Sequence, residues 1–256
     1  MEKQTVLITG ANKGIGLETA RQLANAGYHV FLGCRDKQRG EEAVSQLHSE
    51  GLTSVELVVI DVVDDQSVQQ AYDELSQRID HLDVLINNAG NAHGLDPIQT
   101  GNADDWDAMM DINVKGLLYV SKAVVPFMIK RKKGHIINLG STAAKEAYEG
   151  GNTYCATKTA VDSLSKGMRI DLLRYHIKVT AIHPGAAETE FSMIRFKGSE
   201  EAARKVYEGF HPLSAEDVAD IIFYTASLPP HVCINDLVVT CTQQANSFFT
   251  DRSGSI

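Results

Sequence analysis

Tyr154 and Lys158 are spaced so that they can act together on one face of a helix. They lie in Asn152–Tyr175, whose apolar residues recur with a helical period, and residues at positions i and i+4 project from the same face. A tyrosine hydroxyl has an ordinary pKa of about 10, so acid–base chemistry at neutral pH requires a cation that stabilises the phenolate. Lys158 would supply it. Taken separately, these residues favour ordinary roles, a packed tyrosine and a solvated lysine.

A glycine-rich stretch forms a second candidate site. Thr9-Gly10-Ala11-Asn12-Lys13-Gly14-Ile15-Gly16 separates an expected strand, Thr5–Thr9, from an expected helix, Ile15–Ala26. Glycine lets the backbone approach a pyrophosphate, and the N-terminus of the following helix offers free N–H groups and the positive end of its dipole. Glycines alone also form tight turns, but the flanking strand and helix favour phosphate binding.

The elements that position these residues alternate between strand and helix along the chain. We expect βα units from Thr5 to Asp80 and continuing strands and helices to Cys241, on one doubly wound parallel sheet with helices on both faces. Strands such as Val55–Ile60 and Val84–Ile86 are interpreted as apolar on both faces, as buried parallel strands are. The helical stretch Asp104–Arg131 is expected to be continuous. We predict one α/β domain over residues 1–256.

Composition narrows the possible partners. The chain has 256 residues and a formal net charge of −9, so no overall positive field would hold nucleic acid or an anionic membrane. We expect no membrane-spanning helix, since no apolar run approaches the roughly 20 residues that one needs, and no signal peptide, since the polar start leaves no room for one. The four cysteines lack metal-ligand spacing, so we expect no metal and reduced thiols in a cytoplasmic protein.

Taken together, the motifs resemble those of the short-chain dehydrogenase/reductase family. T-G-x-x-x-G-x-G is the family's glycine motif, and Asn87-Asn88-Ala89-Gly90 follows the fourth strand as it does there. Asn113 matches the family's active-site asparagine, and Tyr154 and Lys158 match its Y-x-x-x-K, with Ser141 at the family's usual separation before the tyrosine. The order and spacing of these motifs outweigh the ordinary interpretations, in which Asn113 bends a helix and Ser141 begins a turn.

The resemblance implies a mechanism and an assembly. Tyr154 would exchange a proton with the substrate, Lys158 would also hold the nicotinamide ribose, Ser141 would bind the substrate oxygen, and Asn113 would position a relay water. The nicotinamide would exchange the hydride with an alcohol or carbonyl substrate. The family's usual assembly is a homotetramer, paired here through Asp104–Arg131 and Asn152–Tyr175.

The resemblance also implies NADP as the cofactor. Arg35, after the second strand, corresponds to a phosphate-binding arginine, and Lys13 is a second candidate cation. Asp36 leaves the choice of NADP over NAD open. If its side chain faces the ribose it would weaken phosphate binding, whereas it could also point outward or form a salt bridge with Arg39. Asp61 and Val62 resemble an adenine-contacting pair, although Asp61 could simply cap a helix. The expected cofactor residues are Gly10, Asn12, Lys13, Gly14, Ile15, Gly16, Arg35, Asp61, Val62, Asn87, Ala89, Gly90, Tyr154, Lys158, Pro184, Gly185 and Thr189.

The region after Pro184 resembles bacterial NADP-dependent 3-hydroxy acid (serine or allo-threonine) dehydrogenases. It carries their T-E-F-S-x-x-R-F-x-G segment, and we expect residues 186–212 to form a lid over the substrate. The expected substrate residues are Ser141, Tyr148, Tyr154 and Arg195. Arg195 either binds a substrate carboxylate or pairs on the surface with Glu190 or Glu200. Where those dehydrogenases carry an aromatic–proline pair this chain has Glu146-Ala147, and we expect Glu146 to point to solvent.

Other functions remain open at this point. The stretches Asn12–Gly16 and Cys34–Asp36 are also similar to those of carbonyl reductases, which would make the chain a broad carbonyl or ketone reductase. A reductase of acyl groups on an acidic carrier protein is disfavoured by the acidic surface. A protein that binds NADP without turnover would keep the fold, but the complete Asn–Ser–Tyr–Lys set argues against it.

Overall fold

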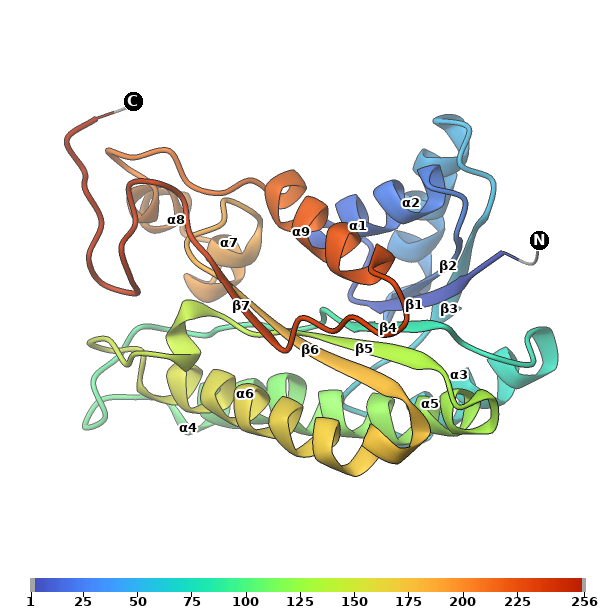
Figure 1. Cartoon of the computed structure of the whole chain (residues 1–256). Coiled ribbons are helices and arrows are strands. Elements are labelled where there is room, and N and C mark those ends of the chain that lie inside the picture. Colours follow the sequence, from blue (N-terminus) through green and yellow to red (C-terminus); the bar gives the residue numbers. More distant parts are fainter. Residues whose placement is uncertain (1–2, 255–256) are drawn as a thin grey trace.

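The computed structural model describes residues 3–254, which form one parallel sheet with helices on both sides (Figure 1). The sheet has seven strands in the order β3-β2-β1-β4-β5-β6-β7, and every neighbouring pair is parallel. This confirms the expected doubly wound fold. The strands are β1 Thr5–Thr9, β2 His29–Cys34, β3 Val55–Val59, β4 Val84–Asn87, β5 Gly134–Leu139, β6 Ile177–Pro184 and β7 Asp236–Val239.

Two helical layers cover the sheet, because each amphipathic helix buries one face against it. Helices α1, α2 and α9 lie on one face, and α3, α5 and α6 lie on the other (Figure 1). The helices are α1 Gly14–Asn25, α2 Lys37–Ser49, α3 Asp65–Arg78, α4 Ala103–Met110, α5 Leu117–Arg131, α6 Asn152–Leu172, α7 Phe191–Arg195, α8 Glu200–Val206 and α9 Ala215–Ser227.

The edge strand β3 departs from the sequence-based expectation. Strands β1, β4 and β5 are buried at every residue, whereas Glu56 and Val59 of β3 are exposed. Glu56 pairs with Arg78 and His29 at the surface. The interpretation of this strand as apolar on both faces was therefore wrong, because a strand at the edge of a sheet is only half covered and a charged residue there blocks pairing with another chain.

The long helical stretch before β5 is helical throughout, as expected, but it includes a π-helical turn. A π-helical turn, Asp111–Gly116, separates α4 from α5. Ala103–Arg131 also has the length and composition of a membrane span, which corrects the expectation that no segment does. Its apolar residues have a second explanation, because Val120, Val124 and Met128 are buried between α5 and the sheet.

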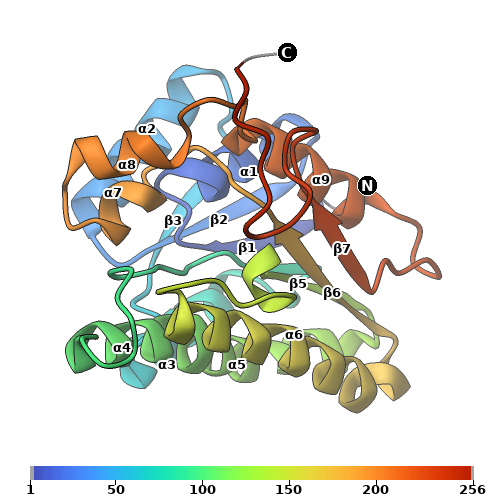
Figure 2. The same cartoon turned by 90° about the vertical axis from the view of Figure 1, so that its left-hand side faces the viewer.

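The carboxyl ends of the strands face a group of loops and short helices. Between β6 and α9 the chain forms α7 and α8, and the segment after β7 runs back alongside them (Figure 2). This segment is fastened by side-chain amides: Gln243 accepts a hydrogen bond from the backbone N–H of His211, and Gln244 accepts one from that of Ala186. Ligands of open parallel sheets bind at these strand ends, so this edge holds the candidate site.

Candidate active site

Tyr154 and Lys158 lie buried on one face of α6, as their spacing predicts. Lys158 Nζ donates a hydrogen bond of 2.8 Å to the backbone oxygen of Leu139 and lies 5.9 Å from the centre of the Tyr154 ring. Burial lowers the pKa of Lys158 to about 8 and raises that of Tyr154 above its ordinary value. A hydrogen bond with Ser141 and the charge of Arg195 oppose the rise at Tyr154.

Ser141 reaches Tyr154 from the end of β5. Its backbone is extended, and its Oγ accepts a hydrogen bond of 3.1 Å from the N–H of Ala143, which caps the short 3₁₀ turn Thr142–Ala144. Ser141 therefore begins a turn, as the ordinary interpretation has it, and also forms a hydrogen bond with the Tyr154 hydroxyl, whereas its catalytic role stays a prediction.

Asn113 is buried in the π-helical turn, where an extra residue in the helix often marks a functional site. Its Oδ1 accepts a hydrogen bond from Asn91 N, and its Nδ2 donates to Asn91 O and to Thr157 Oγ1 at 2.8 and 3.1 Å. The side chain thus braces the loop after β4 against α6. This matches the interpretation of a polar residue bonded to backbone, and a part in a water relay stays a prediction.

The glycine loop has the backbone that a phosphate cradle requires. Gly10 and Gly14 have φ angles of 63° and 54°, which side-chain-bearing residues rarely adopt. A Cβ at Gly16 would lie 2.6 Å from Asn88 Nδ2, so glycine is needed there for close packing. No side chain caps the start of α1, and its first turn carries no acidic residue, which leaves the positive end of the helix open to an anion.

The loop after β4 supports the glycine loop from the other side. Asn88 Nδ2 donates to the backbone oxygens of Thr9 and Gly10, and Ala89 N–H donates to Thr9 Oγ1. Gly90 lies beside Asn113 and Lys158. The Asn87 side chain instead points into the molecule, where its Nδ2 donates to Ser121 Oγ and Asn138 Oδ1.

Arg35 is exposed just after the end of β2, and the side chain of the adjacent Asp36 is bound to helix α2. Asp36 accepts a hydrogen bond of 3.1 Å from the N–H of Arg39 and so caps α2, with a longer contact to the Arg39 side chain. Lys13 Nζ forms an ion pair of 2.7 Å with Glu190 of the segment before α7. Arg35 is thus the less encumbered of the two predicted phosphate-binding cations.

Asp61 and Val62 follow β3 next to the start of α5. Asp61 Oδ1 accepts a hydrogen bond from Val63 N, so the side chain stabilises its own turn rather than capping α3, which Asp64 caps. Val62 is buried against Gly116 and lines a small hollow with Asn87 and Ala89.

The residues after β6 meet the glycine loop. Thr189 lies against Gly14, and its Oγ1 accepts a hydrogen bond from Phe191 N at the start of α7. Gly185 N–H donates to Val239 O, and a Cβ at Gly185 would lie 2.1 Å from Gln244 Oε1. Tertiary structure therefore brings Pro184, Gly185 and Thr189 to the same edge as the glycine motif.

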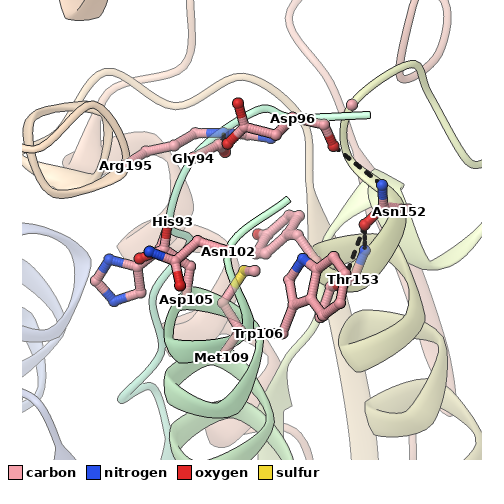
Figure 3. Close-up of a pocket in the computed structure, with 12 residues that line it drawn as sticks. His93, Gly94, Asp96, Asn102, Asp105, Trp106, Met109, Asn152, Thr153 and Arg195 are labelled. Atoms are coloured by element: carbon pink, nitrogen blue, oxygen red, sulfur yellow. Dashed lines mark hydrogen bonds between the residues drawn. The ribbon is translucent and has the colours of Figure 1, made fainter. Parts of the chain in front are cut away.

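Arg195 and Tyr154 line the same open pocket, and Figure 3 shows Arg195 with other residues of its wall. The Arg195 guanidinium lies 5.4 Å from the Tyr148 ring centre and 5.5 Å from that of Tyr154. Arg195 Nε donates to Gly94 O, and Gly94 N donates back to Arg195 O, at 3.2 and 2.9 Å. Tyr148 packs on Gly151 next to this pocket. Within residues 3–254 Glu190 pairs with Lys13, and Arg195 forms no ion pair with Glu190 or Glu200, so the structure does not show the expected alternative of a surface pairing.

Several pocket residues were not identified from the sequence. His93, Gly94 and Asp96 come from the loop after β4, and Asn102, Asp105, Trp106 and Met109 come from α4 and the residue that caps its start (Figure 3). They carry no motif, although the single tryptophan of the chain next to a run of acidic residues was a signal that could have been followed.

Glu146 does not point to solvent as expected. It is half-buried, and its Oε2 accepts a hydrogen bond of 3.3 Å from Ser247 N in the segment after β7. The expectation relied on the cost of burying a charge, but a backbone N–H from a distant segment partly replaces water for this carboxylate.

The fold is that of a dinucleotide-dependent oxidoreductase, and a buried tyrosine–lysine pair lies at the strand ends where its ligand binds. Residues 4–200 match the family model for short chain dehydrogenase, and the chain belongs to this family. It is 41% identical over 249 residues to sulfoacetaldehyde reductase 2 of Chromohalobacter salexigens, covering 96% of this chain and 98% of that protein. It is also 41% identical over 250 residues to the NADP-dependent 3-hydroxy acid dehydrogenase YdfG of Salmonella typhi, covering 97% and 99%.

Solved structures agree with this assignment. The closed form of a serine dehydrogenase complexed with NADP+ superposes with a TM-score of 0.91 at 37% identity, covering 95% of this chain and 97% of that one. Serine dehydrogenase from Escherichia coli gives a TM-score of 0.81 at 33% identity, covering 94% and 100%.

Proposed function

We propose that this protein is an NADP-dependent dehydrogenase of short 3-hydroxy acids. Tyr154 is the acid–base residue, Lys158 and Ser141 assist it, and Arg195 binds the substrate carboxylate. The observation that carries this proposal is the position of the Arg195 guanidinium, which faces the catalytic tyrosine from the wall of the same pocket.

The guanidinium has hydrogen-bonding capacity left for a substrate. Arg195 Nη2 is buried and has no hydrogen-bond partner among residues 3–254. A buried donor without a partner costs about 1–3 kcal/mol, and a carboxylate would relieve this cost through a charge-assisted hydrogen bond. A substrate with an anionic group near its reacting carbon therefore fits this pocket better than a neutral ketone.

The residues around the glycine loop support the assignment of NADP as the cofactor. The glycine backbone, the uncapped start of α1, and the exposed Arg35 suit a dinucleotide with a 2′-phosphate, and the YdfG relative and the serine dehydrogenase structure are both described with NADP. When bound, NADP supplies the site that accepts or gives the hydride. Asp36 supports the same choice, because as the cap of α2 it is turned toward its own helix.

The proton is handled by Tyr154. In alcohol oxidation its phenolate takes the hydroxyl proton, and in carbonyl reduction its phenol gives one back. Burial raises the pKa of Tyr154, so the positive charges of Lys158 and Arg195 and the hydroxyl of Ser141 are needed to stabilise the phenolate. Ser141 also orients the substrate oxygen, since it contacts the same tyrosine hydroxyl.

The acidic side of the pocket favours a substrate that also carries an amino group. Asp96 and Asp105 line the pocket with Arg195, and Asp105 is partly neutralised by an ion pair of 2.8 Å with Lys197. A carboxylate in the pocket attracts an ammonium and repels a second anion. Serine and allo-threonine thus fit better than 3-hydroxypropionate.

A sulfonate-bearing aldehyde is the second candidate substrate. One relative is named sulfoacetaldehyde reductase, and a guanidinium can bind a sulfonate oxygen as well as a carboxylate. Such a substrate carries no ammonium, so it would leave Asp96 without a partner.

A substrate panel tests these assignments. Serine, allo-threonine, 3-hydroxypropionate and 2-propanol are compared for NADP+-linked oxidation, and sulfoacetaldehyde for NADPH-linked reduction. We expect the highest kcat/KM with an amino-bearing hydroxy acid. A preference for 2-propanol would indicate the broad carbonyl reductase, a preference for sulfoacetaldehyde the sulfonate enzyme, and NADPH binding without any turnover a non-catalytic NADP-binding protein.

The assembly, location and lid belong to the same proposal. Ile170, Leu173 and Leu118 expose apolar surface on the helical layer of α5 and α6, which supports a homotetramer paired through these helices. Light scattering of the purified protein measures its mass directly.

The free cysteines support a reducing, cytoplasmic location. Residues 186–212 are proposed as the lid, because Arg195 joins them to Gly94 across the pocket.

A further inference from the structure

His183 lies directly behind the proposed catalytic serine. It is the second-last residue of β6, and its side chain is completely buried. The ring packs on the backbone at the end of β5: a Cβ at Gly140 would lie 2.3 Å from His183 Nδ1, so only glycine leaves room for it. His183 Nδ1 is 3.3 Å from Ser141 N and 3.2 Å from Ser141 O.

The other ring nitrogen faces two carboxylates. His183 Nε2 is 3.3 Å from Asp236 Oδ1 of β7 and 3.6 Å from Asp162 Oδ1 of α6, without a well-aligned hydrogen bond to either. Carboxylates only accept hydrogen bonds, which favours the tautomer with the proton on Nε2. Nδ1 is then an acceptor whose donor is the Ser141 N–H, and its 3.2 Å contact with Ser141 O is not a hydrogen bond in this tautomer.

The same carboxylates hold the other end of the serine turn. Lys145 Nζ lies 2.6 Å from Asp236 Oδ2 and 3.2 Å from Asp162 Oδ1, and Lys166 Nζ lies 2.7 Å from Asp162 Oδ2. Asp162, His183 and Asp236 are close enough together to suggest a metal site, but the Lys145 ammonium already supplies a cation there. The cluster of Asp162, His183, Asp236 and Lys145 is better explained as an anchor, meaning a set of contacts that fixes the turn after β5 to α6 and β7.

This anchor joins the turn that carries Ser141 to the helix that carries Tyr154 and Lys158. Asp162 is one helical turn beyond Lys158 and two beyond Tyr154 on α6, so the helix that carries these residues also fixes the turn that begins at Ser141. A second tie, from Thr159 Oγ1 to Ala144 O, joins the same two segments.

We infer that His183 is a positioning residue that holds the Ser141 backbone so that the serine hydroxyl meets the same substrate oxygen as Tyr154. His183 acts through Ser141 and does not contact the substrate. The inference rests on the proposed catalytic role of Ser141. A displacement of about 1 Å at a catalytic group can cost as much as about 100-fold in rate, so loss of the Ser141 N–H partner has a measurable effect.

A matched pair of substitutions tests the inference. In His183→Asn the amide oxygen can take the place of Nδ1 and still accept from Ser141 N–H. In His183→Gln the polar group reaches toward Asp162 and Asp236, and no acceptor remains at the position of Nδ1. We expect kcat for the best hydroxy acid of the panel to fall about tenfold in the glutamine variant and about threefold or less in the asparagine variant, with NADPH affinity unchanged in both.

A double-mutant cycle with Ser141→Ala separates positioning from general stability. If His183 acts through the serine hydroxyl, His183→Gln changes kcat less than about twofold once that hydroxyl is gone. His135→Gln is the control, since His135 is equally buried but bonds Thr180 at the other end of the sheet. We expect its effect to be the same in both backgrounds. If His183→Gln does not fold, Asp236→Asn at the half-exposed side of the anchor takes its place in the cycle, with the same expected result.

Three outcomes overturn either the role of the serine or that of the histidine. Ser141→Ala with full turnover refutes the proposed role of the serine. A large loss in Ser141→Ala, together with equal losses from His183→Gln in both backgrounds, leaves the proposed function standing and refutes the positioning role. Equal kcat for the glutamine variant and the parent refutes it as well.

Discussion

The Arg195 guanidinium lies 5.5 Å from the centre of the Tyr154 ring, although 40 residues of chain lie between the two positions. The contact places a permanent positive charge beside the proposed acid–base group. Its charge lowers the pKa of Tyr154, against the larger effect of burial. Arg195 therefore has two expected effects, one on substrate binding and one on proton transfer.

The effect on substrate binding predicts that removing Arg195 lowers kcat/KM more for charged substrates than for neutral ones. Arg195→Ala should lower kcat/KM for serine by about 10- to 100-fold, because a charge-assisted hydrogen bond is worth about 1.5–3 kcal/mol. Serine methyl ester and 2-propanol lack the carboxylate and should lose much less. Equal losses on all three substrates would assign Arg195 to lid closure, and no loss on any would make it a surface residue.

The effect on proton transfer predicts a shift in the pH profile. Oxidation requires the phenolate of Tyr154, so its rate rises with pH through the pKa of that group. Removing the Arg195 charge raises this pKa, and the rise in kcat should move to higher pH in Arg195→Ala. Arg195→Lys keeps a charge and is the control. An unmoved profile in the alanine variant would show that the guanidinium does not affect the tyrosine.

Tyr154→Phe removes only the hydroxyl of the proposed acid–base residue. We expect turnover to fall by at least about 100-fold, the usual contribution of general acid–base catalysis, while the fold and NADPH binding remain. Kinetics are compared with NADPH titration by fluorescence and with the thermal midpoint. Activity within tenfold of the parent would rule out this role for Tyr154.

Lys158→Met should weaken NADP+ binding and lower kcat together, because one ammonium is assigned to the ribose and to the phenolate. Burial lowers the pKa of Lys158 to about 8 in the protein without cofactor, so its charge is lost as pH rises through that value. The affinity of the parent for NADP+ should therefore weaken above about pH 8, and that of Lys158→Met should not. Parallel pH dependences in both proteins would contradict the ribose contact.

Cofactor preference is expected to depend on Arg35. Arg35→Ala should reduce kcat/KM with NADPH by about 10-fold or more and leave NADH almost unchanged, since only NADPH carries the 2′-phosphate. Asp36→Asn keeps the cap of α2 and is the matched control, expected to change the ratio little. If the parent uses NADH as well as NADPH, Asp36 rather than Arg35 faces the ribose.

His135 predicts how stability depends on pH. Burial lowers its pKa from 6.5 to about 3, so between these values the unfolded chain binds a proton that the folded chain excludes. Its contribution to the free energy of unfolding therefore falls as pH decreases below 6.5, by up to about 1.4 kcal/mol per pH unit. The free energy of urea unfolding should therefore change less steeply with pH in His135→Gln than in the parent. The substitution His231→Gln at an exposed histidine should leave this pH dependence unchanged.

What the sequence by itself determined is local in origin. The alternation of strands and helices, the glycine backbone of the Thr9–Gly16 loop, and the face shared by Tyr154 and Lys158 follow from periodicity and backbone geometry within short windows. These features were sufficient to predict the doubly wound sheet and the family.

Tertiary structure decided the environment of each group. The exposure of Glu56 depends on β3 being the edge strand, and the π-helical turn at Asn113 lies where it and α4 pack against α6. Glu146 meets Ser247, and His183 meets Ser141, only because distant segments converge on one edge of the sheet. Burial and charge pairing are properties of that convergence, since they depend on which side chains exclude water from one another, and no local window of sequence contains this information.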